Sequence, residues 1–394
     1  MKTAELLSWL IVTWWAFASL SLILNLMMLH RLSEEPADDP LPSLNVVIPA
    51  RNEERDVEAA VASQCSQDFP GLRVIVVEDR STDRTPVILE ALKSRFPNLT
   101  VVRGEDPPAG WMGKQNAMSL GLRQAEGELV LFVDADVPYG PGVLRRLAHE
   151  MARRNLDMLV VMGSMEARGL EPLLISTLYS FPLYGAATFL VNRPRFRRAA
   201  FGFPSGMLVR RDALKAAGGI QAIRDKPIDD VALARLMKAY RGRFRVVTEF
   251  RGVRHRMHRG FREAVDGFSK YAYYALLARP IPAALVVGWD FAVHTLPAVL
   301  LVTSFFFPPL KVLRLPALLS FLAGVLCNAA TSLWARQPLW IAIGFPFRPL
   351  AWSLVLIRSA SRYYRHGLVW RGRTFQPEGN IDNPKTAPKG TGDA

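Results

Sequence analysis

Two carboxylates stand at the end of an apolar run in the stretch Leu-Val-Leu-Phe-Val-Asp-Ala-Asp at residues 129–136. The run predicts a buried strand, and Asp134 and Asp136 follow it with one small residue between them. Residues two apart on a strand point to the same side of a sheet. Two acids placed in this way can hold a divalent cation against an anionic ligand. The alternative is an ordinary strand end that turns into a loop, where aspartate is common.

Short apolar runs alternate with helical segments around these acids. We expect buried strands at residues 44–49, 72–77, 99–103 and 128–133. Strands separated by helices of ~10–15 residues indicate βαβ units and a mostly parallel sheet. In open sheets of this kind ligands bind beyond the carboxyl ends of the strands. Asp79 follows the second run as Asp134 and Asp136 follow the fourth, which favours a ligand site over a simple turn.

The chain also carries segments that suit a bilayer. Residues 6–29 contain no charged side chain, and at ~1.5 Å per residue they span a ~30 Å hydrocarbon core. A secretory signal peptide has a shorter apolar region and a small-residue cleavage site, so we expect a retained anchor. Three further apolar stretches lie at residues 283–307, 315–335 and 337–357.

The third of these stretches differs from the others because it contains Arg348 between Pro346 and Pro349. A charge and two prolines argue against a simple lipid-facing helix. His30 and Arg31 follow the anchor, and basic residues also follow the last apolar stretch: Arg358, Arg362, Arg365, Arg371 and Arg373. Lys and Arg concentrate on the cytoplasmic side of membranes. Both flanks therefore prefer the cytoplasm, and we expect residues 337–357 to be bent, re-entrant or interfacial.

The net charge of +14 is thereby explained without a nucleic-acid partner. Cys65 and Cys327 are the only cysteines and have no metal-ligand spacing, which suits a reducing compartment. We expect an N-terminal transmembrane anchor, an α/β domain, C-terminal membrane helices and a disordered tail, at residues 1–31, 32–280, 281–375 and 376–394. The expected location is the cell membrane, with multiple passes and the α/β domain on the cytoplasmic side.

Five motifs occur in a characteristic order: Pro49–Glu53, Glu78–Asp83, Gly110–Ala117, Phe203–Met207 and Ile228–Ala234. Together with the paired acids, this set resembles the membrane-bound inverting glycosyltransferases of family 2, over roughly residues 42–280. Within this family the chain looks most like the hopene-associated glycosyltransferases, in residues 110–114, 190–194, 207–211 and 228–234. Carotenoid-acid glycosyltransferases and ceramide glucosyltransferase are the next neighbours. The resemblance implies a GT-A fold, and transfer of one sugar from a nucleotide-diphosphate donor, UDP-linked, to a lipid such as a hopanoid or carotenoid.

The resemblance also implies roles for single residues. Asp79 would hydrogen-bond the donor base, in a pocket lined by Pro49, Ala50 and Glu53; helix capping is the alternative for Asp79. Lys114 would neutralise the diphosphate. A lysine near the start of a helix stands at the less favourable end of the dipole, so a bound anion would explain its place. On the acceptor side we expect Trp111, Ser205 and Gly206, although Trp111 could equally anchor a loop.

The spacing of Asp134 and Asp136 restricts how they bind a metal. Their Cα atoms lie ~6.5 Å apart on a strand, whereas oxygens sharing one Mg²⁺ or Mn²⁺ lie within about 4.2 Å of each other. Either the side chains converge, or one acid ligates directly and the other acts through ribose or water. We expect Asp136 to be the direct ligand, and the cation to stabilise the departing diphosphate.

Asp229 and Asp230 supply the remaining chemistry, because attack by a hydroxyl requires removal of its proton. Asp230 matches the family's catalytic base, and the neighbouring carboxylate of Asp229 should raise the apparent pKa values of the pair. The two acids could also cap the helix that follows them. If the acceptor were an ionised carboxylate, no base would be needed and Asp230 would only orient it.

Arginines of the segment Arg254-His-Arg-Met-His-Arg-Gly-Phe-Arg262 suit a diphosphate, and we expect Arg256 and Arg259 to contact it. A membrane-facing basic helix is the alternative. A metal role for His255 and His258 is disfavoured because no third ligand is near in sequence.

Three other functions compete with transfer of one sugar. A processive polysaccharide synthase would carry Gln-x-x-Arg-Trp after the base motif, and this segment lacks it. A membrane-tethered nucleotide-binding protein without activity is disfavoured by the intact acids and Lys114. A dinucleotide-dependent oxidoreductase is excluded because no G-x-G-x-x-G follows the first strand.

Overall fold

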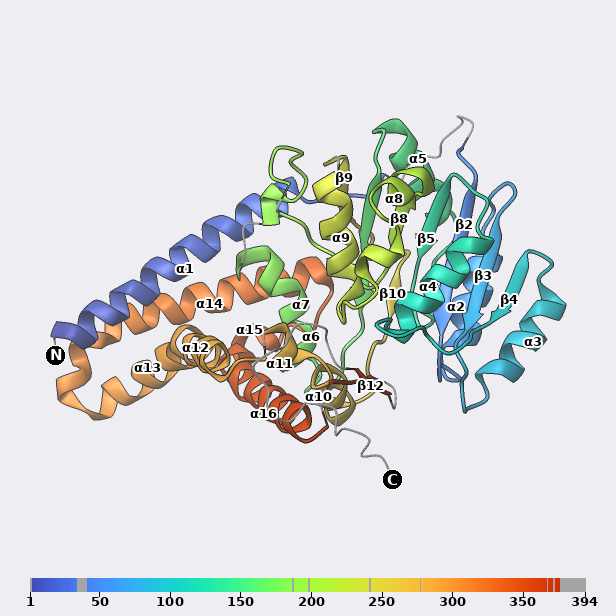
Figure 1. Cartoon of the computed structure of the whole chain (residues 1–394). Coiled ribbons are helices and arrows are strands. Elements are labelled where there is room, and N and C mark those ends of the chain that lie inside the picture. The colour runs from blue at the N-terminus through green and yellow to red at the C-terminus, as the bar shows by residue number, and fades with distance from the viewer. Residues whose placement is uncertain are drawn as a thin grey trace, which may run out of the picture.

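A sheet-based domain and an elongated cluster of helices make up the chain (Figure 1). The computed structural model describes residues 2–375 except 34–40, 186–187, 198, 241, 277, 367 and 371–372. The tail expected to be disordered, residues 376–394, lies outside the described residues.

The described strands form an eight-stranded sheet in the order β1-β9-β6-β8-β5-β2-β3-β4. Only β8 runs antiparallel to its neighbours β5 and β6. The strands span β1 His30–Arg31, β2 Leu44–Ala50, β3 Arg73–Glu78, β4 Leu99–Arg103, β5 Leu129–Phe132, β6 Met158–Met162, β8 Met207–Arg210 and β9 Phe244–Thr248. The four expected strands are all present, with ends that move by no more than one residue. Two shorter pairs join β7 Ser164–Met165 to β10 Arg254–His255, and β11 Leu368–Trp370 to β12 Arg373–Phe375.

Helices cover both faces of the large sheet because its strands are apolar on both sides. On β2, Val47 packs in one core with helices α4 and α9. Val46 and Ile48 pack in the opposite core with α2, α3 and α5. Gly121 of α4 lies so close to the sheet that a Cβ there would stand 2.4 Å from a methyl carbon of Val47. The helices of this domain are α2 Val57–Cys65, α3 Thr85–Arg95, α4 Gly113–Gln124, α5 Val143–Arg153, α8 Arg211–Ala216, η3 Ile220–Ile223, α9 Asp229–Tyr240, α10 Phe261–Phe268 and α11 Ala272–Ala275.

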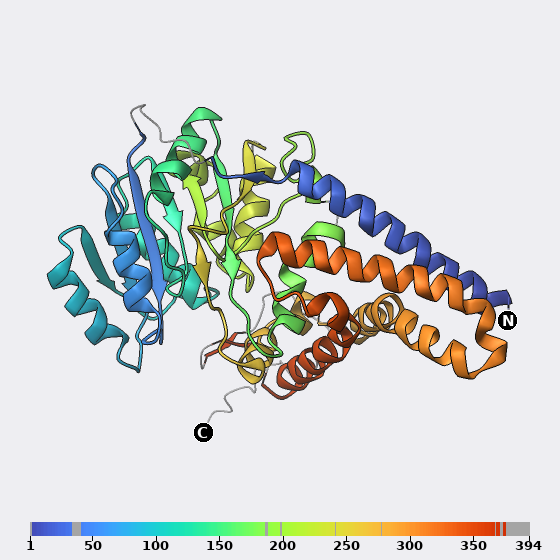
Figure 2. The same ribbon diagram turned by 180° about the vertical axis from the view of Figure 1, so that it is seen from behind.

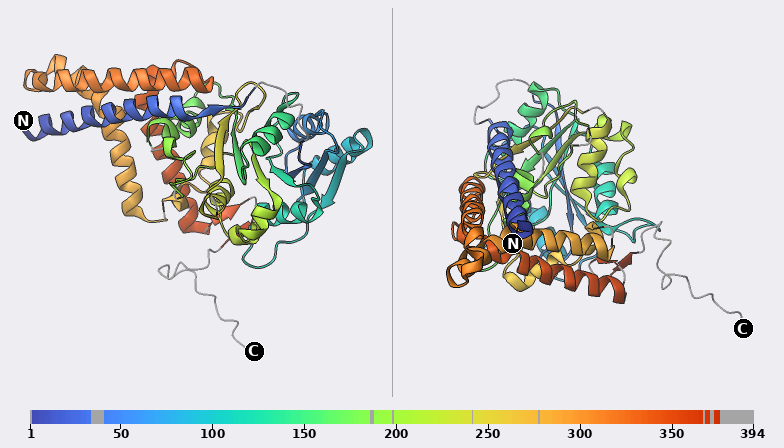
Figure 3. Two further views of the ribbon diagram at one scale, coloured as in Figure 1. Left: turned by 90° about the horizontal axis from the view of Figure 1, so that it is seen from above. Right: turned by 90° about the vertical axis from the view of Figure 1, so that its left-hand side faces the viewer.

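The helical cluster is built on two long helices, α1 Lys2–Met28 and α14 Arg314–Ala335, which lie side by side (Figures 1 and 2). Helices α12 Pro280–Asp290 and α16 Arg348–His366 cross this direction steeply (Figure 3). The remaining segments are α6 Pro172–Ile175, α7 Thr177–Ser180, η1 Phe181–Gly185, η2 Thr188–Leu190, η4 Phe291–Thr295, α13 Leu296–Phe306, η5 Pro308–Leu313, α15 Ile341–Gly344 and η6 Phe345–Phe347.

Four helical segments in the described part of the chain are long and apolar enough to cross a membrane: Lys2–Met28, Pro280–Phe306, Pro308–Ala335 and Ile341–Arg365. This count rests on length and composition alone. The last segment is interrupted by η6 at Pro346. Along α16, Leu350, Leu354 and Ile357 are exposed, at the spacing of one helix face. An apolar stripe on a helix that lies across α1 suits a place in the membrane surface. The expectation that residues 337–357 are bent, re-entrant or interfacial stays a prediction.

Arg348, the charge that made this segment unusual, is buried between helices. Its guanidinium donates to the side-chain oxygens of Tyr184 at 3.0 Å and Asn328 at 2.9 Å. It also donates to Ser180 at 2.8 Å and Thr177 at 3.2 Å. Ionisable side chains in membrane helices normally face the bundle interior in this way. Arg348 therefore ties α16 to α7, η1 and α14.

Candidate active site

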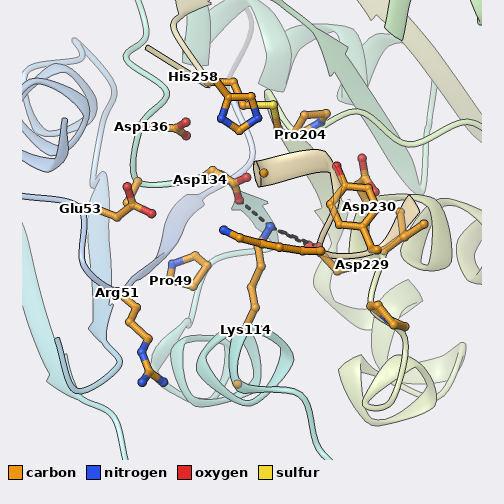
Figure 4. A pocket seen from close by; sticks show the side chains of 18 of the residues that line it. Pro49, Arg51, Glu53, Lys114, Asp134, Asp136, Pro204, Asp229, Asp230 and His258 are labelled. Carbon is orange, nitrogen blue, oxygen red and sulfur yellow. Dashed lines mark hydrogen bonds and ion pairs between the residues drawn. The ribbon is translucent and has the colours of Figure 1, made fainter. Parts of the chain in front are cut away.

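A cavity of about 1140 Å³ opens at the carboxyl ends of β2, β3 and β5. The loops after these strands, the start of α4, the start of α9 and residues 256–259 all line it. Figure 4 shows its acidic part, with Lys114 between Asp134 and Asp229. Most of the expected site residues are brought together here: Pro49, Ala50, Glu53, Asp79, Trp111, Lys114, Asp134, Asp136, Asp229, Asp230, Arg256 and Arg259.

Lys114 joins the two acidic pairs. It stands in the first turn of α4, and its Nζ lies 2.7 Å from Asp134 Oδ1 and 3.0 Å from Asp229 Oδ2. Burial opposes a charge on this ammonium, but the two carboxylates outweigh it and raise the pKa of Lys114. Its position near a helix start is thus explained by two acids of the chain itself. A contact with the donor diphosphate stays a prediction.

The other member of each pair has no such partner. Among the described residues no cationic side chain pairs with Asp136, and its pKa is raised well above the usual range by burial and by the carboxylates of Asp134 and Glu53. Burial and the adjacent Asp229 raise the pKa of Asp230 to about 7. The backbone N–H of Val231 donates to Asp230 Oδ1 at 2.7 Å. The Lys114 ammonium therefore holds Asp134 and Asp229 in place. Asp136 and Asp230, the second acids of the two pairs, remain available in the same cavity.

This arrangement bears on the expected metal. Within the described residues no group of three or more His, Cys, Asp and Glu side chains is ready to hold an ion. Asp136 nevertheless fits a divalent cation, because burial and two nearby carboxylates disfavour its charged form and no described cationic side chain compensates it. A bound cation would supply that compensation. Carboxylate oxygens are the ligands that Mg²⁺ and Mn²⁺ prefer. Asp134 is held by Lys114, which agrees with our expectation that the two acids do different work.

His258 is a residue that the sequence did not single out for the metal. It lines the same cavity as Asp136 (Figure 4). Burial lowers its pKa to about 4, so its imidazole is neutral and has a lone pair free to ligate. His255 is buried and does not line the cavity. No local spacing could reveal that His258 and Asp136 line the same cavity, since they are 122 positions apart in the sequence.

A substitution pair tests the assignment of the metal ligand. We expect Asp136→Asn to weaken Mn²⁺ binding by at least about tenfold, because it removes the carboxylate that no cation neutralises. The matched variant Asp134→Asn should cost less, since Asp134 is engaged with Lys114. Electron paramagnetic resonance of free Mn²⁺ in the presence of UDP measures both without any turnover. A larger loss for Asp134→Asn would contradict this assignment.

The donor-base end of the cavity is formed around Asp79. This residue is 6% exposed and lies 3.6 Å from Arg51 and 3.2 Å from Arg80, measured between charged atoms. Burial is the main cause that raises its pKa, although both arginines act against it. Asp79 lines the cavity as expected. Its hydrogen bond to a donor base stays a prediction.

Arg256 and Arg259 reach the cavity from the loop between β10 and α10. Arg256 donates to the buried carboxylate of Glu171 at 2.8 Å. Arg259 pairs with Asp56 at 2.5 Å, across to the segment that follows β2. Both arginines are thus positioned by acids, and their expected contact with diphosphate stays a prediction.

The acceptor-side residues divide into two groups. Trp111 lines the cavity, as do Phe203 and Pro204. Ser205 is fully buried and does not line it, and its carbonyl accepts a hydrogen bond from Tyr139 at 2.8 Å. Gly206 also lies outside the lining, where a Cβ would stand 2.1 Å from the Tyr139 hydroxyl. Ser205 and Gly206 therefore lie behind Phe203 and Pro204, which line the cavity.

The helical cluster forms the far wall of the cavity. It contains apolar and aromatic side chains from α7, η1 and α16, among them Leu178, Phe181 and Trp352. Trp352 donates to the hydroxyl of Thr177 at 2.8 Å, and Thr177 in turn accepts from Arg348. The cavity thus runs from the acids of the sheet to the helical cluster.

Comparison with known proteins agrees with this geometry. The family model described as "Glycosyl transferase family 2" matches residues 45–218. The chain contains a family 2 glycosyltransferase domain. Its mostly parallel sheet with helices on both faces is the GT-A fold that we expected. The matched range includes Lys114, Asp134 and Asp136 but ends before Asp229 and Asp230, so their roles rest on geometry.

Two curated relatives are 34% identical to this chain, over 165 and 140 residues respectively. One is a beta-monoglucosyldiacylglycerol synthase from Synechocystis, over 39% of this chain and 33% of that protein. The other is an N-acetylglucosaminyltransferase from Rhizobium meliloti, over 34% of this chain and 32% of that protein. The matched segment spans about a third of the length of each relative. Among solved structures, a mannosyltransferase from Pyrobaculum calidifontis in complex with GDP-Man and Mn²⁺ aligns with a TM-score of 0.48 and 19% identity, over 84% of this chain and 99% of that one.

Proposed function

We propose that this protein transfers one sugar, with inversion, from a nucleotide-diphosphate donor, UDP-linked, to a membrane lipid. The observation that carries the proposal is the position of Lys114, which forms an ion pair with one acid of each pair, Asp134 and Asp229. It leaves Asp136 free for a divalent cation and Asp230 free for a proton, in one cavity at the carboxyl ends of the strands. The relatives named as a monoglucosyldiacylglycerol synthase and an N-acetylglucosaminyltransferase support a sugar-transfer reaction.

The reaction follows from the charges in the cavity. The acceptor hydroxyl attacks the anomeric carbon on the face opposite the diphosphate, and Asp230 removes its proton. The bond from the anomeric carbon to the diphosphate oxygen breaks, so the configuration inverts. A divalent cation held by Asp136 would supply positive charge at the departing diphosphate. Arg256 and Arg259 line the same cavity and add fixed positive charge.

The apolar far wall supports a lipid acceptor. Phe181 lines the cavity and is 60% exposed, so the wall continues to the surface of the helical cluster. The exposed apolar stripe of α16 runs from the same region, since Trp352 belongs to that helix. A lipid could therefore present its head group to Asp230 while its apolar part stays against these helices. A hopanoid or carotenoid is the acceptor that the sequence motifs favour.

The same elements support a multi-pass protein in the cell membrane with the family 2 domain on the cytoplasmic side. Helices α1 and α14 are long and apolar enough to span a bilayer. His30 and Arg31 lie two and three residues after the end of α1 and are exposed. Basic residues also line the exposed end of α16. Such residues face the cytoplasm.

One product analysis tests the proposed function. The purified full chain, Mn²⁺, a labelled UDP-sugar and a total lipid extract should yield one discrete glycolipid. A ladder of lengthening products would instead identify a processive polysaccharide synthase. If UDP binds in a metal-dependent way but no UDP-sugar is consumed with any lipid or water, the protein is a nucleotide-binding protein without activity. The Asp230→Asn protein is the matched control for contaminating transferases.

A further inference from the structure

A short basic loop lies outside the active site and no step of sugar transfer uses it. Residues Arg193-Pro-Arg-Phe-Arg197, here called the basic loop, are all exposed. Phe196 is 41% exposed, and the Arg195 guanidinium carbon lies 6.0 Å from the centre of its ring. Among the described residues no carboxylate pairs with any of the three arginines of the loop. Arg197 also donates to the carbonyl of Ala239 at 3.4 Å. The basic loop therefore presents three positive charges around an exposed aromatic ring, and no described carboxylate neutralises them.

The base of the basic loop is held firmly. The Asn192 side chain accepts from the backbone N–H of Val246 at 2.7 Å and donates to its carbonyl at 3.1 Å. The Lys238 ammonium, which is fully buried, donates to the carbonyls of Val191 and of Arg193, the latter at 3.2 Å. Burying an ammonium is costly unless it is well hydrogen-bonded. The fold therefore specifies where this loop stands.

That position is level with the end of α1. His30, two residues after α1 ends, pairs with Val247 of β9, next to the Val246 that Asn192 clamps. Earlier on α1, the Asn25 side chain donates to the carbonyl of Leu183 at 2.7 Å. The segment that leads into the basic loop therefore packs against the last turns of α1. Where α1 leaves the apolar part of a bilayer, the loop meets the head groups.

We propose that the basic loop binds the phosphate groups of anionic phospholipids in the bilayer that holds α1. Arginine forks match phosphate oxygens with two parallel hydrogen bonds. Phenylalanine is one of the apolar residues that enter the boundary between head groups and acyl chains when a basic segment binds a membrane, and Phe196 would insert there between the arginines. Arg31 adds positive charge at the same level, whereas burial and the nearby Arg245 lower the pKa of His30. The proposal rests on α1 crossing the membrane and does not depend on the sugar-transfer reaction.

Lipid binding here would also orient the cavity. Four residues after Arg197 the chain reaches Phe201, which lines the cavity together with Gly202 and Phe203. A loop held on anionic head groups would fix this wall relative to the membrane surface. The lipid acceptor would then enter the cavity at a fixed height relative to the membrane surface.

The test uses a reporter on the loop itself. Cys65 and Cys327 are buried, so a cysteine introduced by Phe196→Cys can be labelled selectively with an environment-sensitive dye. We expect the dye emission to shift to the blue in nanodiscs that contain about 30 mol% phosphatidylglycerol but not in pure phosphatidylcholine, and the shift to fall with added salt. Unlabelled protein with native Phe196 should retain phosphatidylglycerol in preference to phosphatidylcholine through detergent washing.

Two triple variants of the labelled Phe196→Cys protein show whether binding depends on the position of the arginines or only on the net charge. Arg193→Gln, Arg195→Gln and Arg197→Gln together should abolish the blue shift and lower phosphatidylglycerol retention by about fivefold for each arginine removed. Removing three exposed arginines far from the membrane helices, at positions 95, 103 and 123, changes the net charge equally and should leave both readouts unchanged. UDP binding verifies that each variant is folded.

Several results would overturn the proposal. Identical emission of the labelled protein in neutral and anionic nanodiscs would do so, even if the loop variant fails to fold. An equal loss in the control variant would reduce the effect to net charge. A blue shift produced by a soluble polyanion such as RNA in neutral nanodiscs, and not by phosphatidylglycerol, would identify a different partner for the loop.

Discussion

Asp230→Asn is expected to lower kcat for sugar transfer by about 10²–10⁴-fold while UDP affinity stays close to that of the unchanged protein. Asparagine keeps the shape of the side chain and its contact with the Val231 N–H, but it cannot accept the acceptor's proton. Transfer of a labelled sugar to lipid measures the first quantity, and calorimetric titration with UDP and Mn²⁺ measures the second. Equal losses in both would make Asp230 a structural residue.

The pH dependence of the unchanged protein provides an independent check on Asp230. Its pKa is raised to about 7, and a general base acts only when ionised, so kcat should fall as the pH drops through about 7. This limb should be absent from the residual activity of Asp230→Asn. Asp229→Asn should keep this limb but move it to lower pH, because it removes the neighbouring carboxylate that helps to raise the pKa of Asp230. An acceptor that is itself an ionised carboxylate would give neither the limb nor the large loss.

The sequence was sufficient for the parts of the site that depend on local chain geometry. Apolar runs predicted β2, β3, β4 and β5, since a strand buried on both faces leaves a continuous apolar signal. Because parallel strands place their carboxyl ends at one edge, Asp79, Asp134 and Asp136 could be expected to share a cavity, and they do. In the structure the side chains of β2 alternate between two cores, with Val47 in one and with Val46 and Ile48 in the other.

What the sequence could not supply are contacts between distant segments. Lys114 and Asp229 are 115 positions apart, and neither residue has a local pattern that would indicate the other. The wall formed by Trp352 and Phe181 likewise arises from packing of the helical cluster on the sheet domain. Arg348 was recognised as unusual for a membrane helix, but its four neutral hydrogen-bond partners come from three other segments. Tertiary packing, rather than local secondary-structure propensity, decides the Lys114–Asp229 contact, the apolar wall and the contacts of Arg348.

Lys114→Met has the second large effect that we expect, because it removes the ammonium between two acidic pairs and keeps a side chain of similar length. Breaking a buried ion pair by removing one partner typically costs about 3–5 kcal/mol. The lysine side chain is 24% exposed, so we expect a loss in the free energy of unfolding of about 2–4 kcal/mol near pH 8. The exposed Lys215, changed to methionine, is the matched control.

The pH dependence of this loss has a definite sign. Without Lys114, Asp229 and Asp230 lose a charge that lowers their pKa values, so their folded-state values rise further above the unfolded ones. A carboxyl with a raised pKa destabilises the fold progressively as the pH increases through the interval between the unfolded and folded values. Thermal unfolding should therefore show the largest difference between Lys114→Met and the unchanged protein above pH 7 and a small one near pH 5. The acid limb of kcat should move to higher pH in the variant. Lys114→Arg, which keeps the charge, should restore most of the stability, and a pH-independent loss would contradict the bridging role of Lys114.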